Sequence, residues 1–403
     1  MKCFTLILLY FFALSHSFSQ QDIHSFIKLD TLFSTGIKID NEDVVTDNVK
    51  FKLVHDNVWL FYPNWKDNDS IHFLKLNLKT YTKQLINIYV PGISFKILSP
   101  NIKNFDINDS ALVILFHNNC FAYFKLKNKN YVFDFIEPLQ YSFQDIRLLP
   151  NSRLLIYNNY NSHPTGNPDK TILHVYNCKT HKIQASARPH FNNIAFSHFS
   201  PNHWIDVNAN SIMLSQTSSY RISFFDFNLT KINEFAHSEN DWVYADTNYI
   251  NILEGIKPRI SPKDIIDRLS PMEDSVSRIE AIYTLSPTQL LVRKTPANSK
   301  RLNRLRTYDV LKLNSKSNIW KIALRDITDK KPDENEVITK QNFPINSVFH
   351  EVSFNQSYYI KLLPRFTPFQ LGKSIKENKA LEEKALGTTV PEMYIEIFKV
   401  HFN

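Results

Sequence analysis

The sequence predicts an all-β fold, a single six-bladed β-propeller whose N-terminal strand completes the last blade. The first observation is a recurring unit: an alternating segment, a tight polar turn such as Asn108-Asp109-Ser110, and an apolar run such as Leu112–Phe116. The second is a composition rich in Phe, Tyr, Ile and Asn with only 6 Gly, which favours strands joined by asparagine-type turns. The third is a strand-like segment near the N-terminus that belongs to no unit.

The unit occurs six times, and each copy is predicted to contain strands a to d, except the last, which ends after strand c. The predicted strands are 49–54, 58–62, 71–76 and 81–89; 103–107, 111–116, 120–126 and 131–136; 145–149, 154–157, 171–177 and 182–187; 204–207, 211–215, 220–227 and 231–235; 279–285, 289–293, 306–313 and 319–324; and 347–353, 358–363 and 392–400. A repeat that shares buried faces between neighbouring copies explains how one domain uses this length.

The missing strand of the sixth unit is predicted to come from the other end of the chain. Residues His24–Leu32 alternate apolar and polar side chains and precede the first unit. Pairing of this segment with Glu392–Val400 would leave no open sheet edge. Two stacked β-sandwiches fit the same strand spacing, but the sixfold recurrence and the leftover strand favour the propeller.

The N-terminus resembles a secretory signal peptide covering residues 1–19. Lys2 supplies its positive charge, Phe4–Leu14 its apolar core, and Ser17-Phe18-Ser19 a cleavage site before Gln20. An uncleaved anchor is the alternative. Cys3 precedes the apolar core, whereas a lipid-modified cysteine would follow it, so we do not expect a lipoprotein. Residues 20–403 are then one exported domain, periplasmic or extracellular, with no membrane span in the mature chain.

Charge and cysteine content narrow the classes of partner. The net charge is +8, and removal of Lys2 with the signal would leave +7. This balance favours an unknown protein or an anionic small ligand as the partner, and it excludes a nucleic-acid-binding composition. Cys120 and Cys178 are assigned to the third strands of neighbouring units, and two buried free thiols are favoured over a disulfide.

The connections between the predicted strands are unequal, which indicates the face that carries function. The a–b and c–d turns are short and share one face of the propeller. The other face carries long connections, at 158–170, 236–278, 294–305 and 364–391, with short helices predicted over 262–269, 273–278 and 373–386. Long loops in a compact domain are typical of binding surfaces or of disorder.

Basic and imidazole side chains on that face are the candidate ligand-binding residues. Arginine forks suit carboxylate and phosphate groups, and the histidines with Asp169 could bind a transition metal, although their spacing matches no local metal motif. Solvated loop residues are the alternative for both sets, and no metal or cofactor is predicted. The candidates are Arg301, Arg304, Arg188, His163, His190 and His203, with His198 nearby. Trp204 and Asp241-Trp242 could stack on a sugar, but buried packing of the tryptophans is favoured.

Catalytic motifs are missing from the sequence. It contains no Gly-x-Ser-x-Gly elbow, glycine-rich phosphate loop or zinc-protease motif. The sequence therefore favours a non-catalytic binding protein that uses the long-loop face. The alternatives are a propeller-based hydrolase or lyase acting on an anionic or glycan substrate, and a scaffold subunit of an envelope complex.

Two phrases carry a family resemblance. Leu149–Tyr157 and Phe224–Lys231 resemble the a–b and c–d strand signatures of six-bladed, TolB-like β-propellers. Together with the export signal, they make the chain similar to secreted bacterial envelope members of that class. The resemblance implies a fold and a location, and it implies no functional residue.

Overall fold

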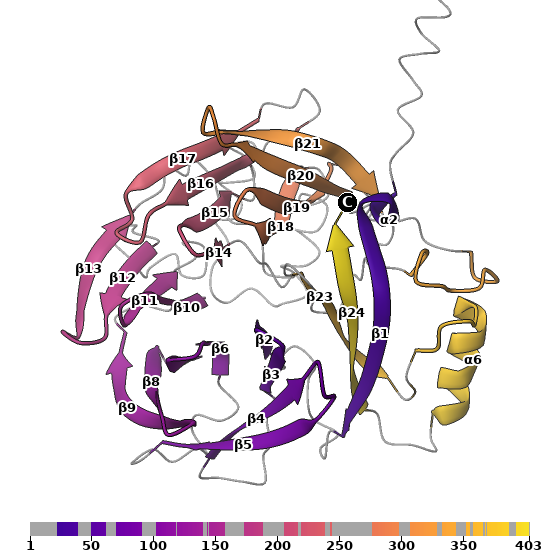
Figure 1. Cartoon of the computed structure of the whole chain (residues 1–403), viewed down its shortest axis with the longest axis horizontal. Helices are drawn as coiled ribbons and strands as arrows, with labels where there is room; N and C mark the ends of the chain where they lie inside the picture. The colour runs from indigo at the N-terminus through magenta and orange to yellow at the C-terminus, as the bar shows by residue number, and fades with distance from the viewer. Residues whose placement is uncertain are drawn as a thin grey trace, which may run out of the picture.

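Four-stranded antiparallel sheets arranged in a ring make up the fold (Figure 1). A computed structural model of the chain describes residues 22–38, 50–61, 70–90, 102–117, 119–139, 143, 145–157, 173–187, 205–216, 219–237, 242–243, 276–297, 307–328, 333–343, 352–354, 358–365, 367, 369–386 and 392–402. In these residues there are six such sheets, which confirms the predicted six-bladed β-propeller.

In each of the first five blades the strands run outward from the propeller axis in chain order (Figure 1). Blade 1 is β2 (Lys50–Val54), β3 (Asn57–Phe61), β4 (Ser70–Asn77) and β5 (Lys83–Tyr89); blade 2 is β6 (Ile102–Ile107), β7 (Ala111–Phe116), β8 (Cys120–Lys127) and β9 (Asn130–Pro138); blade 3 is β10 (Asp145–Leu149), β11 (Arg153–Tyr157), β12 (Leu173–Asn177) and β13 (Lys182–Ala187); blade 4 is β14 (Ile205–Val207), β15 (Ile212–Gln216), β16 (Arg221–Phe225) and β17 (Lys231–Ala236); and blade 5 is β18 (Arg278–Ser286), β19 (Gln289–Thr295), β20 (Thr307–Asn314) and β21 (Ile319–Thr328).

Blade 6 is built from both ends of the chain. Its strands are β22 (Val352–Phe354), β23 (Tyr358–Arg365), β24 (Glu392–Phe402) and, outermost, β1 (Ile27–Lys38). β1 pairs antiparallel with β24 from Ile27 opposite Phe402 to Lys38 opposite Glu392. The strand predicted from His24 begins later, because residues Ile23–Phe26 form the short helix α2.

The hydrophobic core is divided among the blade interfaces. Each of the six apolar clusters found in the described residues joins two neighbouring blades. This follows from strand geometry, because successive side chains of a strand point to opposite faces of its sheet and so to opposite neighbours. Leu290 packs towards blade 4 and Leu291 towards blade 6, for example. The ring is therefore held by contacts that each blade shares with both neighbours.

The two ends of the propeller differ. The short-turn end carries the a–b and c–d turns, and the long-loop end is where the inner strands begin, at Lys50, Ile102, Asp145, Ile205 and Arg278. At the short-turn end, asparagine side chains accept backbone hydrogen bonds: Asn108 Oδ1 from Ser110 and Ala111, and Asn208 Oδ1 from Asn210 and Ser211.

Turn residues other than glycine adopt left-handed backbone conformations at the same end. Asn151 and Ser152 do so in blade 3, and Asn128 and Lys129 in blade 2. In blades 2 and 3 the chain at the c–d turn also bonds to the a–b turn of the same blade: Leu126 N donates to Ser110 O at 2.8 Å, and Cys178 N to Ser152 O at 2.9 Å. These turns agree with a chain that contains only 6 Gly.

One appended helix lies outside β1 (Figure 1). α6 (Ile375–Ala385) falls within the predicted range 373–386, and Ser374 with Glu377 forms a capping box at its start. The predicted helix over 273–278 is wrong at its C-terminal end, since Ser277 is non-helical and Arg278 begins β18. The predicted helix over 262–269 lies outside the described residues.

Cys120 and Cys178 form no disulfide, as favoured from the sequence. Cys178 is buried, and this burial raises the pKa of its thiol to about 12. Cys120 is only partly buried, which corrects the prediction of two buried thiols. Cys120 begins β8, whereas Cys178 follows the end of β12, so the two residues do not occupy equivalent positions.

Candidate functional site

The six side chains predicted to bind a ligand lie outside the described residues. They are Arg301, Arg304, Arg188, His163, His190 and His203; His198, Asp169, Trp204 and Asp241 also lie outside. Much of the four long connections is outside as well. The structure does place the strand ends that these connections join, and charged side chains gather there.

Blade 5 carries a buried network of charged side chains at its long-loop end. Arg278 begins β18, Arg293 and Lys294 lie at the end of β19, and Asp309 lies near the start of β20. The antiparallel registers of these strands bring the four residues to the same end of the sheet. Each is at most 5 % exposed.

On the side of blade 5 that faces blade 6, one carboxylate serves two guanidinium groups. The Glu280 carboxylate, 1 % exposed, lies 3.6 Å from Arg278 Nε and 3.3 Å from Arg293 Nε. Thr295 Oγ1 donates a hydrogen bond of 2.6 Å to Glu280 Oε1. This is a buried cluster of one carboxylate and two guanidinium groups rather than an isolated ion pair.

Two buried tyrosines adjoin Arg293. Tyr283 and Tyr308 belong to the apolar cluster between blades 5 and 6. Burial acts to lower the pKa of Arg293, but Tyr283, Glu280 and Tyr308 outweigh that effect and raise the pKa above its ordinary value. The guanidinium therefore stays charged inside the interface.

On the side of blade 5 that faces blade 4, an ammonium group bridges two carboxylates. Lys294 Nζ lies 2.9 Å from Asp309 Oδ2 and 3.0 Å from Asp326 Oδ1. Asp309 Oδ2 also accepts a hydrogen bond from the Tyr220 hydroxyl of blade 4. Lys294 Nζ lies 5.3 Å from the centre of the Tyr220 ring, and the Trp242 ring stacks on Tyr220 at 5.2 Å. Trp242 is thus buried by packing, as favoured over sugar stacking.

These are the five buried charged side chains of blades 1 to 5 within the described residues: Arg278, Glu280, Arg293, Lys294 and Asp309. Removing an ion from water costs several kcal/mol, and a buried ion pair often gives no net stability over apolar packing. Perturbed and buried charges gather at functional sites. Because these five charges lie at the long-loop end of blade 5, that end is a better candidate for a functional site than the short-turn end.

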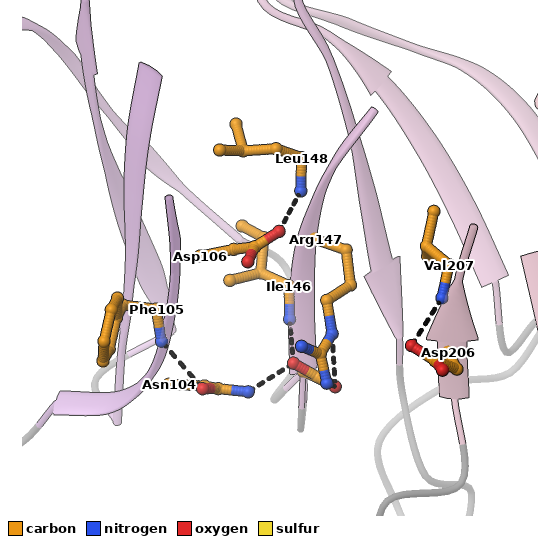
Figure 2. A network of polar contacts seen from close by, with 9 residues as sticks. Asn104, Phe105, Asp106, Ile146, Arg147, Leu148, Asp206 and Val207 are labelled. Atoms are coloured by element: carbon orange, nitrogen blue, oxygen red, sulfur yellow. Dashed lines mark hydrogen bonds and ion pairs between the residues drawn. The ribbon is translucent and has the colours of Figure 1, made fainter. Parts of the chain in front are cut away.

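A second polar group joins the inner strands of blades 2 and 3 (Figure 2). Arg147 donates to Asp145 Oδ2 from Nη2 at 2.7 Å and from Nε at 3.1 Å. Asp145 Oδ1 accepts from the backbone N–H of Ile146 at 2.8 Å and from the side-chain amide of Asn104. Asn104 Oδ1 in turn accepts from Phe105 N at 2.8 Å.

Two aspartates at corresponding positions link neighbouring blades through the backbone. Asp106 Oδ2 of blade 2 accepts from Leu148 N of blade 3 at 2.7 Å, and Asp206 Oδ2 of blade 4 accepts from Thr284 N of blade 5 at 2.8 Å. Figure 2 shows Asp106 directed at Leu148 and Asp206 beside Val207. Asp206 Oδ1 also accepts a hydrogen bond of 2.9 Å from the backbone N–H of Val207. Each aspartate lies two residues before the turn asparagine of its blade.

The charges of these inner strands influence one another. Burial raises the pKa of Asp145 to about 6, and the positive charge of Lys52 opposes this rise. Burial likewise raises the pKa of Asp106; Lys52 opposes the rise and Asp206 adds to it. The carboxylate oxygens accept hydrogen bonds from backbone N–H groups and from Arg147. These bonds therefore connect neighbouring blades and do not present an acid and a base to a substrate.

A group of basic side chains, here called the cationic cluster, lies at the long-loop end of blades 1 and 2. Lys50 begins β2, Lys103 is the second residue of β6, and His117 follows β7. Burial lowers the pKa of Lys103 to about 8. Partial desolvation, and then the charges of Lys103 and Lys50, lower the pKa of His117.

The sequence reasoning missed these strand-end residues because it looked for function in loops. A usable signal was present in charged residues set inside apolar strand runs. Glu280 lies in Arg278-Ile279-Glu280-Ala281-Ile282, and Arg293 and Lys294 close the apolar run of β19. A charge in such a run must be buried with partners, moved to the strand end, or disruptive.

Among the described residues, no three His, Cys, Asp or Glu side chains are grouped so that they could hold a metal ion. No helix in the same part of the chain has the length and apolarity to cross a membrane.

Comparison with known proteins identifies the fold alone. No family model matches this chain, and no curated protein is detectably related to it in sequence. Among solved structures, the chain is similar to a Bacteroides fragilis protein provisionally described as exported, with a TM-score of 0.58 and 10% identity over 96% of this chain and 98% of that one. It is also similar to a member of the DUF4221 family from Bacteroides vulgatus, with a TM-score of 0.48 and 8% identity over 94% of this chain and 100% of that one.

Proposed function

We propose that this protein is an exported, non-catalytic binding protein whose ligand docks at the long-loop end of the propeller. The observation that carries the proposal is the uneven distribution of charge: the buried charged side chains of blades 1 to 5 in the described residues all lie at that end of blade 5. The long connections, with the predicted ligand-binding residues Arg301 and Arg304 between β19 and β20, leave the sheets from the same end.

The chemistry of the described carboxylates favours binding over catalysis. Asp145, Asp106 and Asp206 are engaged by backbone N–H groups, and Asp145 also by Arg147. A general acid or base needs an oxygen free to reach its substrate. Export is supported by the N-terminal signal pattern and agrees with the description of the Bacteroides fragilis protein of the same fold.

The test is to purify the protein from the envelope of the cell that makes it and to measure, by native mass spectrometry and calorimetry, what it binds. The double variant Arg301→Ser/Arg304→Ser removes two positive charges from the long-loop end. Its matched control is Lys179→Ser/Lys316→Ser, which removes two from exposed c–d turns at the short-turn end. We expect the first to weaken binding by about tenfold or more and the control to retain it.

Three results would overturn this function. Equal loss of binding in both double variants would show that net charge, not the long-loop end, governs the interaction. Turnover of an anionic or glycan substrate would favour the hydrolase or lyase, and stable co-purification of an envelope complex through other surfaces would favour a scaffold.

A further inference from the structure

We propose that β5, the outermost strand of blade 1, is a docking edge for a second copy of this chain, whose own β5 pairs with it antiparallel to form a two-fold symmetric dimer. The strand lies on the outside of the ring and at the edge of its sheet (Figure 1). This inference goes beyond the proposed function, because it concerns the side of the propeller and not its long-loop end.

Regular pairing distinguishes β5 from the other outermost strands. In the described residues, β9, β13, β17, β21 and β1 each pair with their inner neighbour through a shift of register, that is, a β-bulge or irregularity. β5 pairs with β4 without a shift, from Lys83 opposite Leu76 to Tyr89 opposite Ser70. Bulges on an edge strand hinder its pairing with another chain, so β5 is the outermost strand best suited to accept one.

The exposed side chains of β5 include two large apolar groups. Leu85 is 52 % exposed and Tyr89 is 63 % exposed. Ile86 and Ile88 pack towards blade 2, so Leu85 and Tyr89, which alternate with them, share the opposite face of the strand. Within the described residues, the outermost strands of blades 2 to 5 expose one large apolar side chain each, namely Val132, Ile183, Ile232 and Ile319.

The backbone of β5 presents hydrogen-bonding groups along its outer edge. Asn77 N donates to Thr82 O at 2.9 Å, so the backbone groups of Thr82 point towards β4. These groups alternate in direction along a strand, and those of the odd-numbered residues from Lys83 to Tyr89 therefore point away from β4. In the part of the chain that the structure describes, no other strand pairs with this edge.

The sequence of β5 is self-complementary in an antiparallel pair. With Ile86 on the two-fold axis, the whole strand overlaps and the outward-pointing residues face each other, which gives about eight hydrogen bonds between the copies. Leu85 then lies opposite Asn87 of the second copy, and diagonal to Leu85 and Tyr89 of the second copy.

The charge on β5 favours a second copy as the occupant. Lys83, at the first position, is the one charged residue of the strand. In the fully overlapping register it lies opposite Tyr89 of the second copy, so its ammonium group meets an aromatic ring instead of another cation. Like charges therefore do not oppose each other along the paired strands.

The first test compares two exposed positions by sedimentation of the full exported chain. We expect the wild type to dimerise with a Kd on the order of 10 µM, because one pair of strands makes a small interface. Leu85→Lys places two added ammonium groups diagonal to each other and should weaken dimerisation by about tenfold or more. The control, Ile183→Lys, adds the same charge at a similarly exposed position of β13 and should dimerise like the wild type.

The second test maps the register with cysteine variants under oxidising conditions. Ile86→Cys places two thiols at the two-fold axis, in a pair whose Cα atoms lie about 4.5 Å apart, which is within disulfide range. Gln84→Cys is the matched control, because Gln84 lies opposite Ile88 of the second copy and its two thiols are far apart. The wild type reports any linkage through Cys120 or Cys178. We expect disulfide-linked dimers from Ile86→Cys alone, and circular dichroism verifies that each variant folds.

The proposal is overturned if the wild type stays monomeric at about 500 µM, well above the expected Kd. It is also overturned if Leu85→Lys dimerises as well as Ile183→Lys does, or if Gln84→Cys cross-links as readily as Ile86→Cys. A monomer that instead binds an extended segment of another protein, and loses that binding in Leu85→Lys, would assign the edge to a different partner and would likewise overturn it.

Discussion

The two ends of this propeller use polar side chains in opposite ways. At the short-turn end, asparagines such as Asn108 and Asn208 accept hydrogen bonds from backbone N–H groups and fix the turns. At the long-loop end of blade 5, charged side chains such as Glu280, Arg293 and Lys294 contact mainly one another. At the short-turn end, the polar side chains provide hydrogen-bond acceptors for backbone N–H groups, and the turns require these acceptors. At the long-loop end of blade 5, these charged side chains are buried although no backbone hydrogen bond of the described residues requires them there. This difference between the ends is the basis on which the proposed function places the ligand at the long-loop end.

The largest expected effect on stability comes from removing a buried charge, and it is compared with the removal of a more exposed charge at the other end. Glu280→Leu should destabilise the protein by about 3–5 kcal/mol, because it leaves Arg278 and Arg293 buried without the carboxylate between them. Asp56→Leu, which removes the partly exposed partner of the exposed Lys79 at the short-turn end, should stay close to the wild type. Denaturant unfolding measures both, and equal effects would break the comparison between the two ends.

The second prediction has the opposite sign. Lys103→Met should stabilise the ligand-free protein by about 1–2 kcal/mol near neutral pH, because it removes a partly desolvated ammonium. The folded pKa of Lys103, about 8, lies below its ordinary value of 10.5. The unfolded chain therefore binds more protons between these values, and the wild type gains stability as pH rises through them.

The gain from Lys103→Met should consequently be greatest below about pH 8 and shrink as the pH approaches 10.5. Urea unfolding at several pH values tests this, with Lys182→Met as the control. A loss of stability at every pH would make Lys103 a structural residue.

A smaller effect is expected at the short-turn end. Asn208→Ala should cost about 1–2 kcal/mol, because the backbone N–H groups of Asn210 and Ser211 lose their acceptor. Asn210→Ala is the matched control, since Asn210 takes part in this turn through its backbone. If thermal unfolding finds the two variants equal, the side-chain acceptor does not fix the turn.

The smallest effect concerns an exposed pair between two a–b turns. His55 Nε2 lies 2.7 Å from Asp109 Oδ2, and this hydrogen bond, with the charge of Asp109, raises the pKa of His55 above 6.5. Its contribution to stability is present in full below pH 6.5 and is lost as the pH rises through the folded pKa. Asp109→Asn should lower the melting temperature slightly below pH 6.5, and this effect should disappear as the pH rises through the folded pKa of His55. A shift that persists above the folded pKa would assign the effect to turn geometry rather than to charge.

Much of the fold was predictable from local patterns. The strands over 111–116, 145–149 and 182–187 coincide with their predicted ranges, and most others differ by one or two residues. Side-chain alternation and turn chemistry are properties of neighbouring residues, so a single sequence reveals them. The helix α6 was likewise predicted, and its capping box is formed within four consecutive residues, Ser374 to Glu377.

By itself, the sequence determined the number of blades, the strands of each blade and the inequality of the two ends, because these depend on local periodicity and on connection length. The tertiary structure alone decided which charges meet. Asp206 reaches Thr284 across 78 residues, and Tyr220 reaches Asp309 across 89. Such contacts depend on how whole sheets pack against each other. That packing is the sum of many non-directional apolar contacts, and the spacing of residues along the sequence does not predict it. For the same reason, the burial of Glu280 and Lys294 became visible only in the folded ring.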